Sequence, residues 1–184
     1  MERASRSPIL CGKKHCVILN GIDTGLFHTY GNESAAKLKK EFRIGNEHVV
    51  FHATADFRSD LNHIKGGYYI IELAKRMPEF KFIIAGNSND DIKVPDNITL
   101  LGNITDKERL AKMYSMADLT VIASKKETFS MIVAESLCCG TPIVGFKAGA
   151  PEMIALPEYS VFSEYGDLDI LERNVRLFID KKCV

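Results

Sequence analysis

Two basic residues lie just before a pair of glycines in the segment ATADFRSDLNHIKGG, which follows an apolar stretch of the sequence. Arg58 and Lys65 are the cations, and Gly66-Gly67 opens a helical pattern. The free backbone N–H groups and the dipole at such a helix start add to the positive charge of nearby side chains. The segment therefore indicates an anion site, for which a phosphate is the natural guest. A solvated loop with surface cations is the alternative.

Two glutamates eight positions apart make up the second group of candidate residues. Glu127 follows another apolar stretch, and Glu135 lies in the second turn of the helix that we expect over 130–139. Ser130 suits the N-cap of that helix, which would leave the first backbone N–H groups free to meet an anion. Those groups belong to Met131, Ile132 and Val133. A carboxylate in the second turn can reach back over the helix start and accept hydrogen bonds from vicinal sugar hydroxyls. The alternative is a pair of ordinary helix-start carboxylates, which the dipole favours.

Apolar stretches that alternate with helical ones must position these residues. Strands are expected over 49–53, 82–85, 98–101, 119–123, 143–146 and 161–162, with a short strand over 17–19 before them. Helices are expected over 34–42, 67–76, 105–116, 130–139 and 167–180, the third with a capping box from Thr105 to Glu108. This order predicts an α/β fold with a doubly wound, Rossmann-like parallel sheet. Ligands of such sheets bind beyond the carboxyl ends of the strands, where both groups of candidate residues lie.

The composition narrows the classes of function. The 184 residues carry 24 Lys plus Arg and 24 Asp plus Glu, and this zero net charge disfavours a protein that mainly coats nucleic acid or an anionic membrane. No apolar run approaches the roughly 20 residues of a membrane helix. Five cysteines without CxxC spacing disfavour a disulfide framework and a structural zinc site, and favour a reducing compartment. The sequence has no P-loop, and no GxGxxG follows a strand.

The stretch ETFSMIVAESLCCGTPIVGFKAGAPEMI carries a specific resemblance to a known family. Three features carry it: the E-x7-E pattern of Glu127 and Glu135, the run CGTPIV over 139–144, and the G-x-x-E of 149–152. Together they resemble the C-terminal, donor-binding half of GT-B glycosyltransferases of the retaining group 1 (GT4-like) family.

Other parts of the chain extend this resemblance, with two departures. Lys65, followed by glycine, maps onto the family lysine, and Arg58 maps onto the family arginine. The segment NGID over 20–23 resembles the point where the family's chain leaves its first domain, so the likeness runs from about residue 17 to the end. Ser130 stands where the family often has glycine. The segment DFRSDLNHIKG is longer than the family's usual one.

The resemblance implies one half of a GT-B fold, with a UDP-, GDP- or ADP-sugar as the ligand. Arg58 and Lys65 would hold the diphosphate, and Glu135 would accept hydrogen bonds from the ribose hydroxyls. Glu127, the one catalytic candidate, would contact the donor sugar. The remaining donor-binding candidates are Thr128, Phe129, Ser130, Met131 and Ile132 at the helix start, and Gly102, Asn103 and Ile104 around the base. Transfer of a hexose-type sugar would retain its anomeric configuration, without a metal or other cofactor.

The resemblance also implies a division of the chain. Residues 1–30 would form an N-terminal segment with the remnant of an interdomain linker, and 31–184 the nucleotide-sugar-binding domain. The acceptor domain of a GT-B enzyme is missing, so we expect the chain alone to bind donor weakly, or nucleotide only, with little transferase activity. The expected partners are that domain and a nucleotide-diphosphate sugar, with no nucleic acid, and the acceptor is a glycan or a lipid-linked one. We expect a cytoplasmic protein, with peripheral association at the inner membrane face through the missing half.

Three other classes of protein stay open from the residues. A non-catalytic nucleotide-sugar-binding or regulatory module would share the pocket. A sugar-nucleotide epimerase of GT-B fold is disfavoured by the E-x7-E pattern. A flavodoxin-like or receiver-type domain would not require the four charged residues Arg58, Lys65, Glu127 and Glu135 to converge.

Overall fold

A six-stranded sheet organises the chain. The computed structural model describes residues 5–16, 18, 20–88 and 91–182. The strands are β1 (Val49–Phe57), β2 (Lys81–Ser88), β3 (Ile98–Leu100), β4 (Leu119–Ile122), β5 (Ile143–Phe146) and β6 (Ser160–Ser163). The helices are α2 (Asn32–Glu41), α3 (Gly67–Arg76), α4 (Lys107–Met116), α5 (Met131–Cys138), α6 (Pro151–Ile154) and α7 (Leu168–Lys182), with a 3-10 turn at Pro157–Tyr159.

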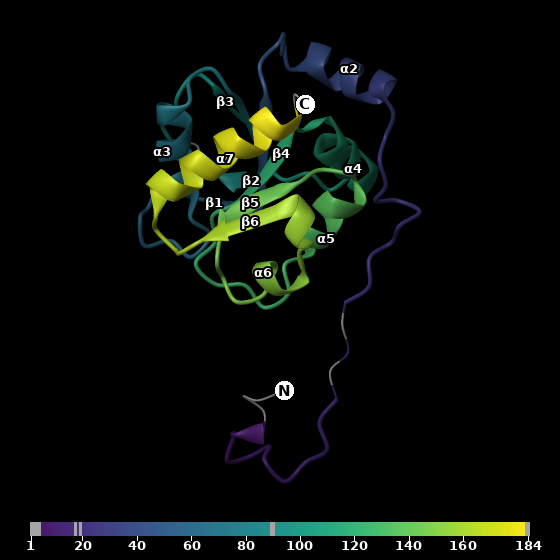
Figure 1. Ribbon diagram of the computed structural model, residues 1–184, viewed down its shortest axis with the longest axis vertical. Coiled ribbons are helices and arrows are strands. Elements are labelled where there is room, and N and C mark those ends of the chain that lie inside the picture. The colour runs from purple at the N-terminus through teal and green to yellow at the C-terminus, as the bar shows by residue number, and fades with distance from the viewer. Residues whose placement is uncertain (1–4, 17, 19, 89–90, 183–184) are drawn as a thin grey trace.

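All strand pairs are parallel, in the order β3-β2-β1-β4-β5-β6. The chain runs outward from β1 to β3, crosses back to β4 beside β1, and then runs outward again to β6. Helices α3 and α7 cover one face of the sheet, and α4 and α5 cover the other (Figure 1). The predicted doubly wound, Rossmann-like parallel sheet is therefore confirmed. The crossing between β1 and β4 is the switch point where such sheets open a crevice.

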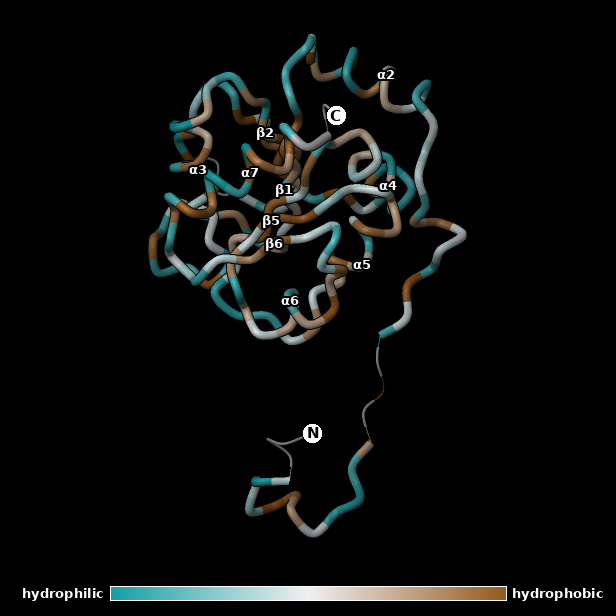
Figure 2. Tube along the Cα trace, in the orientation of Figure 1, coloured by the Kyte–Doolittle hydropathy of each residue, from teal (hydrophilic) through white to brown (hydrophobic). Residues whose placement is uncertain are grey.

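The strands are apolar on both faces because both faces are covered. On β1, Val50 and Phe57 pack in the layer under α3 and α7, whereas Val49 and Phe51 pack in the layer under α4. Figure 2 shows the hydrophobic colour concentrated along the strands, with hydrophilic colour on the outer turns. Two core layers thus hold the sheet rigid beneath its carboxyl edge.

Three local expectations need correction. β1 and β2 extend to Phe57 and Ser88, beyond the apolar stretches that predicted them, because their carboxyl ends pair with each other as they approach the edge. The N-cap of α4 is Asp106 and not Thr105, since the Asp106 carboxylate accepts hydrogen bonds from the N–H groups of Glu108 and Arg109 at 3.0 and 3.2 Å. Aspartate is as strong a cap as threonine, so two adjacent candidates competed.

The N-terminal segment extends away from the rest of the domain (Figure 1). Of the strand expected over 17–19, Val17 and Leu19 lie outside the described residues, and Ile18 between them is 86% exposed and belongs to no strand. Phe27 is nearly buried and packs in the layer under α4. The division of the chain at residue 30 stays a prediction. Among the described residues, no helix combines the length and apolar character that a membrane crossing requires.

Candidate functional site

A cavity of about 220 Å³ opens at the carboxyl edge of the sheet, beside the switch point. It is lined by Ala53, Thr54 and Ala55 of β1, Ala85 and Gly86 of β2, Asn103 and Ile104 after β3, Leu110 and Tyr114 of α4, and Met131, Ile132 and Glu135 of α5. Four small residues form part of the wall where β1 and β2 meet, namely Ala53, Ala55, Ala85 and Gly86. The cavity therefore collects five of the sequence-derived candidates: Asn103, Ile104, Met131, Ile132 and Glu135.

Glycine is required at position 86 of this wall. Gly86 has a φ of +155°, and a Cβ there would lie 2.3 Å from the carbonyl oxygen of Thr54. No heavy atom tolerates that separation, so any side chain would force β1 and β2 apart. The N–H of Gly86 donates to the carbonyl of Gly102 at 2.8 Å, which ties the loop after β3 to the same wall.

Lys65 and Glu127 meet although 62 positions separate them. Lys65 Nζ lies 2.8 Å from Glu127 Oε1, and the two side chains are only 29% and 13% exposed. The backbone holds them together, because the N–H of Lys125 donates to the carbonyl of Ile64 at 2.8 Å. Gly66 adopts a φ of +69°, and a Cβ there would lie 2.0 Å from the carbonyl oxygen of Ala123. The loop before α3 is thus packed directly on the loop before α5.

Glu152 supports this second loop from behind. Its carboxylate accepts hydrogen bonds from the N–H groups of Ala148 and Gly149, at 3.0 and 2.9 Å. Partial burial alone would raise the pKa of Glu152, but hydrogen bonds from backbone N–H groups, its own and those of Ala148 and Gly149, more than offset that effect and lower the pKa. The carbonyl of Ala148 in turn accepts from the N–H of Glu127 at 2.9 Å. Glu152 therefore holds the loop between β5 and α6, and that loop in turn bonds to the loop that carries Glu127.

The start of α5 lies next to the cavity and is strained. Ser130 occupies the N-cap position with φ 70° and ψ 78°, and its side chain caps nothing. Its hydroxyl oxygen is buried without a hydrogen-bond partner. Within the described part of the chain, the N–H groups of Met131 and Ile132 donate to no acceptor. The expectation of a third free group was wrong, because the N–H of Val133 donates to the Ser130 carbonyl at 3.1 Å.

Glu135 points a carboxylate at the cavity from the second turn of α5. Its Oε2 accepts a hydrogen bond from the Tyr114 hydroxyl at 3.0 Å. Burial raises the pKa of Glu135, while the Tyr114 hydrogen bond and Lys107 act in the opposite direction. Tyr114 was not among the candidates from the sequence, because it falls on a helical stripe that reads as core. Its sole functional signal is a polar tip on a buried ring.

The remaining candidates lie farther from this group. Arg58 Nε pairs with Asp56 Oδ2 at 2.7 Å, and Arg58 lines a second cavity of about 290 Å³ with Ser59, Asp60 and Asp91. Among the described residues, no ion pair joins Arg58 to Glu127, and Arg58 does not line the first cavity. Thr128 is exposed and Phe129 is half-buried in the loop before α5. Gly102 adopts a φ of +68° just after β3.

His52 is buried in the core and bonded to the protein backbone. His52 Nδ1 lies 2.9 Å from the carbonyl oxygen of Val121, and burial lowers the pKa of this imidazole to about 4. It is therefore the neutral core histidine that its place in a buried strand predicts. Over residues 5–16, 18, 20–88 and 91–182, no three His, Cys, Asp or Glu side chains gather in a way that could hold a metal ion.

Known proteins match this chain in sequence and in fold. The family model for group 1 glycosyl transferases matches residues 54–182. D-inositol 3-phosphate glycosyltransferase of Mycobacteroides abscessus is 26% identical over 147 residues, which are 72% of this chain and 31% of that protein. The Anabaena protein Alr3699/HepE, solved in complex with UDP, has a TM-score of 0.74 at 21% identity, over 89% of this chain and 47% of its own.

A separately solved domain matches over most of both chains. The C-terminal domain of the group 1 family protein LpcC from Francisella tularensis has a TM-score of 0.69 at 22% identity, covering 87% of this chain and 88% of that one. By contrast, this chain spans about a third of the length of the Mycobacteroides relative. The family model covers well over half of the chain and includes all of the cavity lining except Ala53, the Lys65–Glu127 pair and the start of α5. The chain therefore belongs to the group 1 glycosyltransferases, and its fold is that of one half of a GT-B enzyme.

Proposed function

We propose that this chain is a donor-binding domain that holds a nucleotide-diphosphate sugar at the carboxyl edge of its sheet. The observation that carries the proposal is the meeting of Lys65, in the loop before α3, with Glu127, in the loop before α5. The start of α5 has two free N–H groups and adjoins a cavity that Glu135 lines. A cation, a helix N-terminus and two carboxylates match the parts of such a donor. The HepE neighbour, solved in complex with UDP, supports a nucleotide as the ligand.

Each group has one part of the donor to bind in this proposal. The cavity takes the base and ribose, with Glu135 accepting hydrogen bonds from the ribose hydroxyls and Asn103 and Ile104 beside the base. The N–H groups of Met131 and Ile132 and the Lys65 ammonium hold the diphosphate, through charge-assisted hydrogen bonds worth about 1.5–3 kcal/mol each. Arg58 would reach the diphosphate only after leaving Asp56.

Glu127 has a double role in the same scheme. Without donor, it holds the Lys65 ammonium at 2.8 Å. With donor bound, the diphosphate takes over the ammonium and Glu127 accepts hydrogen bonds from the sugar hydroxyls. As the bond between sugar and diphosphate breaks, negative charge grows on the leaving group, and the cation and helix start stabilise that charge. We propose transfer of a hexose-type sugar with retention, to a glycan or lipid-linked acceptor bound by a separate domain.

The site assignment predicts which substitutions weaken binding. Lys65→Ala and Glu135→Ala should each reduce the affinity for the best-binding nucleoside diphosphate among UDP, GDP and ADP by about tenfold or more, which is roughly 1.4 kcal/mol. Lys126→Ala is the matched control, because Lys126 is an exposed lysine beside Glu127. Calorimetric titration measures all four proteins. Unchanged affinity in both variants would refute the site.

Turnover is expected to need more than this chain. We expect the chain to bind nucleotide without transferring sugar, since it spans about a third of a family relative. Chromatography of the reaction mixture measures transfer. If the isolated chain transfers sugar to an added acceptor, that expectation is contradicted. Donor binding without turnover in a protein that carries both domains would favour the non-catalytic module instead.

We also propose a cytoplasmic location, with any peripheral membrane contact made by the other domain. Cysteines 11, 16, 138 and 139 are free thiols, which suits a reducing compartment.

A further inference from the structure

A buried tyrosine touches the proposed ribose-binding carboxylate. Tyr114 has no exposed surface, and its hydroxyl donates to Glu135 Oε2 at 3.0 Å. Both residues line the cavity, from α4 and α5 respectively. A buried phenol needs a hydrogen-bond partner, and here the partner is a group to which the proposed function gives a ligand.

The two backbones that carry this pair are tied to each other. The Thr141 hydroxyl donates to the carbonyl of Tyr114 at 2.5 Å. Next to Glu135, Ser136 Oγ lies 2.8 Å from Thr120 Oγ1 and 2.9 Å from the Thr141 carbonyl oxygen. These bonds are buried, so they join α4, α5 and β4 into one frame. The distance between the Tyr114 hydroxyl and Glu135 is therefore fixed by the scaffold.

The ring of Tyr114 is also held in place. It packs edge-on against Phe51 of β1, with ring centroids 5.0 Å apart and an interplanar angle of 90°. Such packing restricts the ring to one orientation, and with it the direction of the hydroxyl. A hydroxyl held in this way can select one conformation of the carboxylate to which it donates its hydrogen bond.

The hydrogen bond leaves one oxygen of Glu135 available. Oε2 accepts from Tyr114, whereas Oε1 accepts from no donor among the described residues. We propose that Tyr114 is a positioning residue that locks Glu135 through Oε2 and so presents Oε1 to the ribose hydroxyls of the donor. This inference rests on the proposed function, since it assigns Glu135 the ribose.

The electrostatic surroundings agree with that role. Burial raises the pKa of Glu135, and the Tyr114 hydroxyl and Lys107 of α4 partly restore the charged form. Cys139, the residue that follows α5, is another titratable group nearby, and burial raises its pKa to about 11, so it stays neutral. Burial and Glu135 hold the pKa of Tyr114 well above its usual range, so the phenol remains a donor. The cavity walls from β1 and β2 contain no titratable side chain.

Tyr114→Phe tests the proposal because it keeps the ring and removes only the hydroxyl. Tyr30→Phe is the matched control, since the Tyr30 hydroxyl donates to the Leu26 carbonyl at 3.2 Å and lines no cavity wall near Glu135. Calorimetry compares the tightest of UDP, GDP and ADP with its 2′-deoxy analogue, from pH 5 to pH 8. We expect Tyr114→Phe to lose about fivefold or more in affinity for the ribonucleotide and much less for the analogue.

The pH profile separates positioning from a structural role. Loss of the phenol removes a group that favours the charged carboxylate, so the pKa of Glu135 rises further. The pH below which binding fades should therefore move upward in Tyr114→Phe and stay unchanged in Tyr30→Phe. Equal losses for both nucleotides with no shift in the profile would overturn the inference. Absence of nucleotide binding by the parent chain would instead overturn the proposed function.

Two further variants keep the test decisive. In a Glu135→Gln background, Tyr114→Phe should cost little more affinity, whereas a full additional loss would show that Tyr114 does not act through Glu135. If Tyr114→Phe fails to fold, Thr141→Val loosens the tie to the Tyr114 carbonyl and leaves the phenol in place. An upward shift of its pH profile supports the inference, and an unchanged profile overturns it.

Discussion

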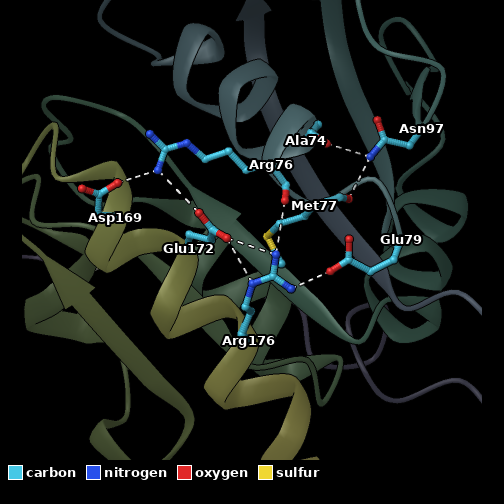
Figure 3. A network of polar contacts seen from close by, with 8 residues as sticks. All are labelled: Ala74, Arg76, Met77, Glu79, Asn97, Asp169, Glu172 and Arg176. Carbon is cyan, nitrogen blue, oxygen red and sulfur yellow. Dashed lines mark hydrogen bonds and ion pairs between the residues drawn. The ribbon is translucent and has the colours of Figure 1, made fainter.

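The carboxyl edge of the sheet and the contact between α3 and α7 both contain ion pairs, but they differ in the polar groups that surround these pairs. Between the helices, Arg76 pairs with Asp169 at 2.5 Å and lies 3.5 Å from Glu172, and Arg176 pairs with Glu79 at 2.5 Å and with Glu172 at 3.0 Å (Figure 3). Every charge in this network faces an opposite charge. At the sheet edge, the Lys65–Glu127 ion pair is accompanied by a carboxylate oxygen, two N–H groups and a buried hydroxyl that have no partner among the described residues.

The difference lies in which polar groups are left unsatisfied. Proteins pair nearly all of their buried polar groups, so clustered exceptions mark places where something else binds. The network between α3 and α7 pairs its arginines with carboxylates of the protein itself. The sheet edge has unsatisfied donors and acceptors around a cavity. This difference supports the proposal that the ligand binds at the edge, and we expect the network to contribute to stability.

Protonation of His52, which is buried in β1, should give the largest change in the free energy of unfolding. Its imidazole has a pKa of about 4 in the fold, because burial disfavours the cation, against about 6.5 when unfolded. Below pH 6.5 the unfolded chain takes up a proton that the folded chain refuses, so the free energy of unfolding falls as pH drops toward 4. The loss is about 3 kcal/mol at 1.36 kcal/mol per pH unit.

Urea denaturation at pH 7 and pH 4 measures this loss. The control is His52→Asn, which keeps a donor toward the Val121 carbonyl but does not titrate. Its stability should depend on pH less than that of the parent by the same amount. An identical pH dependence in both proteins would contradict the neutral, buried imidazole.

Asn97 sharpens the contrast between the two regions. Its Nδ2 lies 3.0 Å from the carbonyl oxygens of both Ala74 and Met77, at the end of α3 (Figure 3). It also lies 3.1 Å from the carbonyl oxygen of Phe80. Asn97→Ala leaves these acceptors short of donors and should lower the free energy of unfolding by about 2 kcal/mol, with no effect on nucleotide binding. Asn103→Ala, at the cavity, should weaken nucleotide binding and leave the free energy of unfolding unchanged. If Asn97→Ala weakens binding as much as Asn103→Ala does, the two regions are not separate.

Ser130→Ala tests whether the start of α5 is strained for function. The Ser130 hydroxyl is buried and unpartnered, so its replacement by a methyl group removes a desolvation cost without changing the φ of 70°. We expect the free energy of unfolding to rise by about 1 kcal/mol. A thermal melt without ligand measures it. A clear loss of stability would mean that the hydroxyl already has a partner in the protein.

Arg76→Ala should give the smallest change in the free energy of unfolding. It breaks the short pair with Asp169, where Arg76 is 41% and Asp169 85% exposed, and the longer one with Glu172, which keeps its pair with Arg176. Exposed ion pairs contribute at most about 1 kcal/mol, and salt screens them. Denaturation at low and high salt should show a small difference that disappears at high salt. A loss as large as that of Asn97→Ala would show that the network is more than a surface clamp.

Much of the fold was open to prediction because the signals are local. The helix over 67–76 and the strand over 143–146 were located to the residue, since glycine or proline punctuates their ends. Within the site, the sequence pointed to Lys65, Glu127 and Glu135 through spacing at strand ends. Tyr114 was not predicted, because its partner Glu135 lies 21 positions away on another helix. No local pattern separates a phenol that positions another side chain from an aromatic ring of the core. Likewise, the pairing of Arg58 with Asp56 depends on the course of the extended β1.

Backbone amide shifts in an NMR titration test the central claim most directly. A nucleoside diphosphate is added to the isotope-labelled chain, and the ¹H–¹⁵N signals of the two regions are compared. The account predicts the largest shifts at Met131 and Ile132, with Glu135 close behind and Arg76 and Arg176 unchanged. Saturable binding that shifts the α3–α7 signals and leaves the start of α5 unmoved would contradict it.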